Sequence, residues 1–119
     1  MATHDILIIS DYLSVMVKGT LTQADFRKIT DEIFELSMEK DVRKVIIDVT
    51  ETAGTFSDAD KIEFAKYASE ILKNNIHKYA YVYPHELLNY SSQFVAKGRG
   101  LNVRAYYSVE DALEWIEKD

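Results

Sequence analysis

The fold is set by one stretch of the chain, Arg43-Lys-Val-Ile-Ile-Asp-Val-Thr-Glu-Thr-Ala-Gly-Thr-Phe-Ser-Asp-Ala-Asp60. Its first part, Lys44 to Val49, is a nearly continuous apolar run, which is typical of a central strand that is covered on both faces. A polar loop follows, and Ser57 and Asp60 have the spacing of a capping box that begins a helix. In an open α/β sheet, ligands bind beside the loops that leave the carboxyl ends of the strands. The region around Ser57 is therefore the leading candidate for a functional site.

The rest of the chain repeats this alternation of strand and helix, in the order β-β-α-β-α-β-α-β-α. Such alternation favours a mainly parallel sheet with right-handed crossovers, and the short break after the first strand favours an antiparallel hairpin. We therefore expect one α/β domain over residues 1–119, with a single mixed, mostly parallel five-stranded sheet flanked by about four helices. The expected strands are Asp5 to Ser10, Leu13 to Lys18, Lys44 to Val49, Tyr79 to Tyr83 and Val103 to Tyr107, and the expected helices start near Thr22, Ser57, Glu86 and Ser108.

The composition excludes several classes of function. The net charge is −6, which argues against nucleic acid or an anionic membrane as a partner, because both require a basic face. The chain has no cysteine, so disulfides and thiolate chemistry are excluded. The first apolar run, Ile6 to Ile9, is too short for a signal sequence or a membrane span. We expect a cytoplasmic protein.

No group of residues has the spacing of a known catalytic or metal site. The acids around Asp58 and Asp60 lack the EF-hand spacing that calcium requires, and they suit the positive end of a helix. His85 is expected at the same sheet edge as Ser57, but no Gly-x-Ser-x-Gly elbow accompanies the pair. His4 is expected in a frayed terminus. The sequence therefore predicts no enzyme activity, no metal and no cofactor.

Two interpretations of Ser57 stand side by side. One is a phosphoacceptor or anion-binding hydroxyl, since a helix N-terminus attracts negative charge. The other is a helix N-cap, a role in which serine is among the preferred residues. The second is favoured because Asp58 and Asp60 already occupy that helix end and would repel a phosphate. The surrounding rim for a partner or ligand is expected to contain Thr20, Thr22, Glu51, Thr52, Thr55, Asp58, Asp60 and His85.

Four stretches resemble the STAS domain, and especially its SpoIIAA-like (STAS/SEC14-type) branch of small bacterial proteins. They are the strand from Val15 that ends in Gly-Thr-Leu-Thr22, the strand Lys44-Val-Ile-Ile-Asp48, the loop to Ser57, and the closing segment from Gly100 to Ile116. The resemblance extends over almost the whole chain. In phosphorylation-controlled anti-sigma-factor antagonists of this fold, an Asp-Ser-Ser-Gly motif holds the regulated serine, and the matching position is Ser57. The local sequence is Thr55-Phe-Ser-Asp58, without the first acid, the second serine or the glycine.

The resemblance implies a non-enzymatic regulatory module that binds a protein through the region around Ser57. A second hypothesis is a carrier of a small apolar ligand of the SEC14 type. It depends on the helix expected from Glu86 to Lys97, which has more apolar residues than one narrow face requires: Leu87, Leu88, Tyr90, Phe94 and Val95. A homodimer is a further expectation, because the first strand would leave a sheet edge unpaired.

Overall fold

The computed structural model describes residues 2–52, 57–82 and 100–118. Its strands are β1 (Ala2–Ile9), β2 (Tyr12–Gly19), β3 (Lys44–Thr52), β4 (Lys78–Val82) and β5 (Val103–Tyr106), and its helices are α1 (Gln23–Lys40), α2 (Asp58–Leu72) and α4 (Val109–Glu117). The described residues thus contain three helices, where about four were expected. The expected helix from Glu86 to Lys97 lies outside the described residues.

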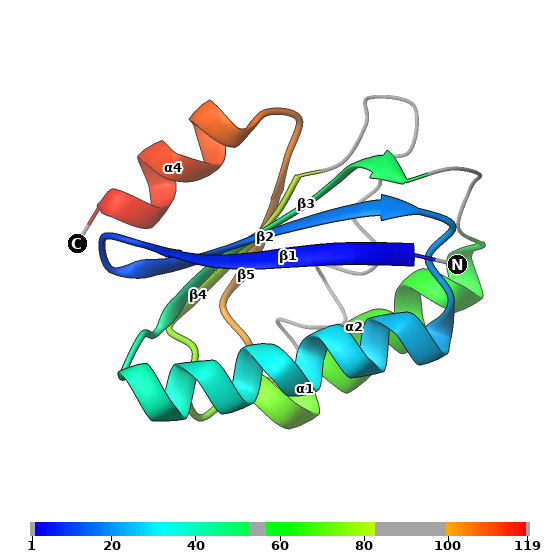
Figure 1. The fold of residues 1–119 in the computed structure, drawn as a ribbon, viewed down its shortest axis with the longest axis horizontal. Helices are drawn as coiled ribbons and strands as arrows, with labels where there is room; N and C mark the ends of the chain where they lie inside the picture. The colour runs from blue at the N-terminus through cyan, green and yellow to red at the C-terminus, as the bar shows by residue number, and fades with distance from the viewer. Residues whose placement is uncertain (1, 53–56, 83–99, 119) are drawn as a thin grey trace.

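The five strands form one sheet in the order β1-β2-β3-β4-β5. β1 and β2 are antiparallel, whereas the other neighbouring pairs are parallel. The prediction of a mixed, mostly parallel sheet with an initial hairpin is confirmed. Each parallel crossover moves one strand further in the same direction, so α1 and α2 cover the same face of the sheet. Figure 1 shows both helices below the sheet and α4 on its other side.

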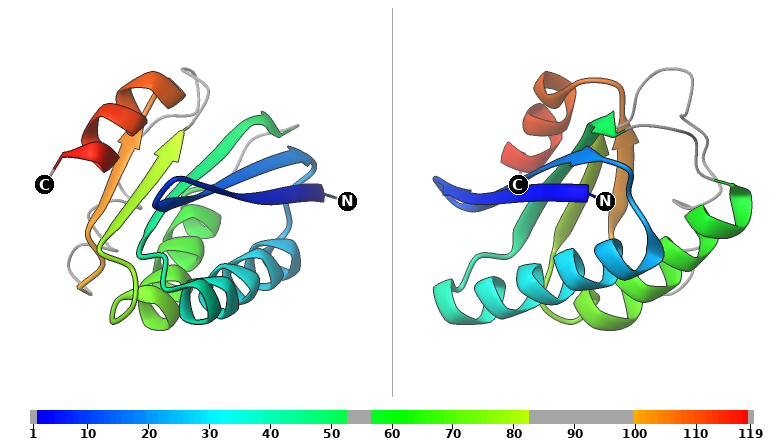
Figure 2. Two further views of the ribbon diagram at one scale, coloured as in Figure 1. Left: turned by 60° about the vertical axis from the view of Figure 1, so that its left-hand side comes forward. Right: turned by 45° about the vertical axis from the view of Figure 1, so that its right-hand side comes forward.

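The sheet has an apolar core on each face. On the face of α1 and α2, residues such as Val15, Ile47 and Tyr79 are fully buried, and the rings of Phe26 and Phe64 stack between the two helices at 4.5 Å. On the other face, α4 packs on β3, β4 and β5 through a smaller cluster of Tyr12, Ile46, Ala80, Val82, Ala112, Trp115 and Ile116. Figure 2 shows these layers from two further directions. β3 is therefore covered on both faces, as its apolar run predicts.

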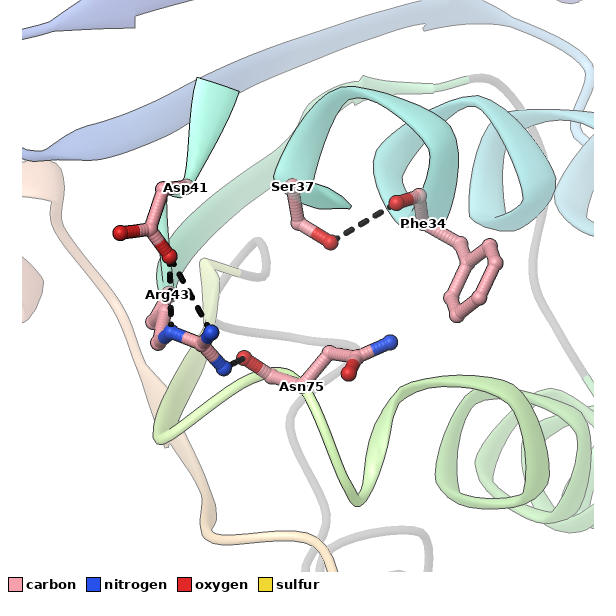
Figure 3. A network of polar contacts seen from close by, with 5 residues as sticks. All are labelled: Phe34, Ser37, Asp41, Arg43 and Asn75. Atoms are coloured by element: carbon pink, nitrogen blue, oxygen red, sulfur yellow. Dashed lines mark hydrogen bonds and ion pairs between the residues drawn. The ribbon is translucent and has the colours of Figure 1, made fainter. Parts of the chain in front are cut away.

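The C-terminal end of α1 is joined to the neighbouring segments by a polar network. Asp41 ends the helix in the left-handed conformation, with φ 53°, and its backbone N–H donates to the carbonyl of Ser37. The Asp41 carboxylate accepts from the Arg43 guanidinium at 3.1 Å, and Arg43 also donates to the carbonyl of Asn75 at 3.5 Å. Ser37 donates to the carbonyl of Phe34 at 2.8 Å. Figure 3 shows how these contacts connect α1 with the turn before β4.

The C-terminal end of α4 has no basic residue in its own last turn. Lys78 of β4 supplies the charge instead: its Nζ donates to the carbonyls of Trp115, at 2.8 Å, and Lys118. A cation at this position complements the helix dipole and satisfies carbonyls that have no partner within the helix. No helix in the described part of the chain is long and apolar enough to cross a bilayer.

Two expected strand boundaries were wrong. β1 begins at Ala2 rather than Asp5, because Ala2, Thr3 and His4 continue the ladder opposite β2. His4 is therefore a strand residue, not part of a frayed terminus, and its ring bonds to the carboxylate of Glu32 on α1. β3 continues past Val49 to Thr52, because its last residues pair with the end of β2.

Candidate functional site

The carboxyl ends of β2 and β3 gather most of the predicted rim. Lys18 and Gly19 at the end of β2 pair with Glu51 and Thr52 at the end of β3. α1 starts after β2 and α2 starts after β3, so both helices have their N-termini at this edge. Here we call the following residues the Ser57 rim: Thr20, Thr22, Glu51, Thr52, Ser57 and Asp60. Asp58 is the first residue of α2, and Thr55 and His85 lie outside the described residues.

Ser57 caps α2. Its backbone is extended, with φ −69° and ψ 161°, and its hydroxyl oxygen accepts from the backbone N–H of Asp60 at 3.0 Å. The Asp60 carboxylate accepts in return from the backbone N–H of Ser57 at 3.4 Å. These reciprocal bonds are the predicted capping box, in which the acid takes the place of the usual Glu. Ser57 is exposed to solvent, so its hydroxyl combines a structural bond with an accessible position.

Thr22 caps α1 in the same way. Its Oγ1 accepts from the backbone N–H of Asp25 at 3.1 Å, and its own N–H donates to the Asp25 carboxylate at 3.1 Å. The same carboxylate accepts from the backbone N–H of Ala2 at 3.3 Å. Hydrogen bonds to a carboxylate stabilise its charged form. The bonds that Asp25 accepts, first from the backbone and then from the side chain of Thr22, therefore hold the pKa of Asp25 below its ordinary value.

One residue joins the two capped helix starts. The Gln23 side chain in the first turn of α1 donates to the carboxylate of Asp60 at 3.2 Å and lies 3.4 Å from the Asp60 carbonyl. The Gln23 bond, followed by those from Ser57, holds the pKa of the Asp60 carboxyl below its ordinary value. Asp60 is thus ionised at neutral pH, and its carboxylate accepts from Gln23 and from the backbone N–H of Ser57. The sequence contains no local sign of this bond, because Gln23 and Asp60 meet only through the packing of α1 on α2.

The acids near this edge do not form a metal site in the described residues. Asp48 is buried, and its Oδ1 accepts from the backbone N–H of Thr50 at 2.9 Å and from the Thr50 hydroxyl at 2.6 Å. Glu51 forms an exposed ion pair with Lys18 at 3.7 Å. Within the parts of the chain that are described, no group of three or more His, Cys, Asp or Glu side chains is placed to hold a metal ion. The edge presents capped helix starts and hydroxyls.

This sheet, with its initial hairpin and its capped helices at one edge, defines an α/β domain of the STAS type. The sequence matches the model of the family described as SpoIIAA-like over residues 12–117. The chain therefore belongs to the SpoIIAA-like family, as the resemblance of its motifs predicts. Among curated proteins, none matches the sequence.

Solved structures confirm the fold. An anti-sigma factor antagonist from Mycobacterium paratuberculosis is 12% identical, with a TM-score of 0.67 over 99% of this chain and 96% of that chain. A protein with a SpoIIAA-like fold from Shewanella loihica is 21% identical, with a TM-score of 0.62 over 97% of this chain and 93% of that one. A serine-to-glutamate variant of RsbS from Moorella thermoacetica is 12% identical, with a TM-score of 0.63 over 96% and 94% of the two chains.

Proposed function

We propose that this protein is a non-enzymatic regulatory module that binds a protein partner through the Ser57 rim. The observation that carries the proposal is the bonded pair of helix starts, in which Gln23 connects the capping box of Ser57 to that of Thr22. An anti-sigma factor antagonist is among the proteins that share the fold. We extend the binding of a protein partner to this chain on that basis.

The geometry of the rim suits a protein surface better than a small anion. The backbone N–H groups of Asp25 and Asp60 are already bonded to the cap hydroxyls. An anion would have to displace these bonds and would lie beside two ionised carboxylates, which opposes its binding. A protein contact needs no such displacement. Because reciprocal hydrogen bonds already order the two helix starts, less ordering entropy is lost there when a partner binds.

The same geometry favours unmodified Ser57 as the binding form. A phosphate on its hydroxyl would add about −1.5 to −2 charges beside the Asp60 carboxylate, which reaches back to the Ser57 N–H. We propose that such a modification, where a kinase makes it, opens the capping box and weakens partner binding. The variant Ser57→Glu is expected to weaken binding at least as much as Ser57→Ala. Equal or tighter binding by Ser57→Glu would contradict this part of the proposal.

Site-specific cross-linking tests the proposed partner surface. A photoreactive residue is placed at Glu51 in the rim and, as a matched control, at the exposed Glu110 of α4, and each protein is irradiated in a cell extract. A partner of the rim should cross-link from position 51 and not from position 110. The purified partner should then bind Glu51→Arg about tenfold more weakly than wild type and bind Glu110→Arg normally. Cross-linking that is equal from both positions, or equal affinities of the two variants, would refute the proposal.

The second hypothesis, a carrier of a small apolar ligand, depends on residues 86–97, which lie outside the described residues. Among the described residues, the cavity between β1 and α1 and the one beside α4 are both lined by charged side chains, including Glu32 and Arg104. A third cavity, between α1 and α2, is lined by Phe34 and Ile71 together with the acids Asp31, Glu35 and Glu70. We keep the carrier as the alternative. Native mass spectrometry of the purified protein tests it: a carrier should show the added mass of an apolar ligand, and a spectrum of the bare chain alone would remove it.

A further inference from the structure

β1 leaves one edge of the sheet open. It is the first strand in the sheet order, and β2 is its only neighbour among the described strands. Figures 1 and 2 show it at the margin of the sheet, beside α1. Its last residues are unusually apolar for an exposed edge: Leu7 is 61% exposed, Ile8 44% and Ile9 42%. A long apolar edge presents backbone N–H and C=O groups that can pair with another strand.

An acidic groove runs along this edge. A cavity of about 520 Å³ opens between β1 and α1, and its lining includes three acidic residues of α1, Glu32, Glu35 and Glu39. Glu32 bonds to His4, and Glu39 lies 3.6 Å from Lys40. Within the described parts of the chain, no ion pair is formed by Glu35. The groove therefore has uncompensated negative charge directly beside the open strand.

The register of the β1–β2 hairpin determines which side chains would lie beside an added strand on each face of the sheet. His4 and Ile6 lie opposite Val17 and Val15, whose side chains face α1 and α2. Because side chains alternate along a strand, Leu7 and Ile9 face the other side of the sheet. A strand that pairs with β1 would thus place every second side chain over the α1 carboxylates. The side chains between them would lie beside Leu7 and Ile9.

A second copy of this chain fits the edge poorly. A two-fold pairing of β1 with β1 brings the same surface of both copies together. The row of Glu32, Glu35 and Glu39 would then face its own copy, in a protein with a net charge of −6. Like charges that face each other across an interface oppose association. A partner of the opposite charge satisfies both the edge and the groove.

We propose that the edge of β1 binds an extended segment of a protein partner in which Lys or Arg alternates with apolar residues. The basic side chains pair with the carboxylates of α1, the apolar side chains cover Leu7 and Ile9, and the two backbones extend the sheet by one strand. The residues that the test changes, Leu7, Glu35 and Glu39, are not part of the Ser57 rim, so the test does not depend on that rim.

The test uses a short fluorescent peptide in which arginine and valine alternate, with a control peptide of the same composition in which the arginines are grouped. The alternating peptide should bind the wild-type protein more tightly, with an affinity that falls as salt is added. Hydrogen exchange should show new protection of the β1 amides. Equal binding of both peptides, no binding of either, or protection located elsewhere would overturn the proposal.

Charge-matched variants distinguish binding in the acidic groove from attraction by the net charge of the protein. Glu35→Lys with Glu39→Lys should weaken peptide binding about tenfold or more, whereas Glu110→Lys with Glu114→Lys on α4 makes the same change in net charge and should have a much smaller effect. All four side chains are exposed, so both variants should fold, and circular dichroism checks that they do. Leu7→Lys should also weaken binding. Equal loss in the two double variants would overturn the proposal, and so would protection of β1 that grows with protein concentration when no peptide is present.

Discussion

Ser57→Ala tests whether the serine at the start of α2 is a helix cap. The substitution removes the hydroxyl oxygen that accepts from the Asp60 N–H at 3.0 Å. Loss of a serine N-cap costs about 1 kcal/mol of the free energy of unfolding. Because Ser57 is exposed, no cavity forms and water can reach the freed N–H. The longer bond, in which the backbone N–H of residue 57 donates to the Asp60 carboxylate at 3.4 Å, does not involve the lost hydroxyl.

The expected loss of about 1 kcal/mol corresponds to a decrease of about 4 °C in the melting temperature of a domain of this size. Urea denaturation measures it directly, with an unchanged dependence on urea concentration showing that the same surface unfolds. Ser57→Asn is the matched control, because asparagine caps helices about as well as serine and adds no charge beside Asp60. An unchanged stability of Ser57→Ala, or an equal loss of stability in Ser57→Asn, would refute the role of Ser57 as a helix cap.

Three further perturbations test the fold and the rim. The pKa of Asp60 is lowered in the folded protein, so the stability that its ionised carboxylate contributes is present above the ordinary value of 3.8 and is lost as the pH falls through the folded value. Urea denaturation from about pH 6 to pH 3 should therefore show a smaller loss of stability in Asp60→Asn than in wild type. An equal loss of stability in the two proteins would contradict the lowered pKa of Asp60. Phe26→Ala removes a ring that is 1% exposed and stacked on Phe64. The substitution should lower the free energy of unfolding by about 3–5 kcal/mol in the same assay. A decrease below about 1 kcal/mol would mean that the ring is not part of a packed core. Gly100→Ala should destabilise the protein by about 1 kcal/mol or more, because Gly100 has φ +99°. The added methyl would make only an ordinary van der Waals contact, 3.7 Å from Lys73 Cδ, so the backbone conformation would be the cause of the loss. Unchanged stability would show that no strain arises.

Local patterns in the sequence predict much of this structure. Both capping boxes are present as expected, because each joins residues three positions apart and depends only on the geometry of a helix start. The apolar run in β3 predicts a strand covered on both faces, and both faces are covered. The alternation of elements also predicts that Ser57 and Thr22 share one edge, since helices that follow parallel strands start at the same side of the sheet.

Contacts between distant residues were not predictable in the same way. Gln23 and Asp60 are 37 positions apart, and His4 and Glu32 are 28 apart. Each bond depends on how one element packs on another. The periodicity of residues within a single segment contains no information about that packing. For the same reason, the sequence alone predicts a frayed terminus for His4, although pairing with β2 makes it part of a strand.

The central proposal is that a protein partner binds the Ser57 rim. The most direct test is to record the amide chemical shifts of the isotope-labelled protein while the purified partner, identified by cross-linking, is added. If the partner binds the Ser57 rim, the largest changes should fall at the two capped helix starts, from Thr20 to Asp25 and from Glu51 to Asp60, with few changes in α4. Changes centred on α4 or on β5, with the helix starts unaffected, would contradict it.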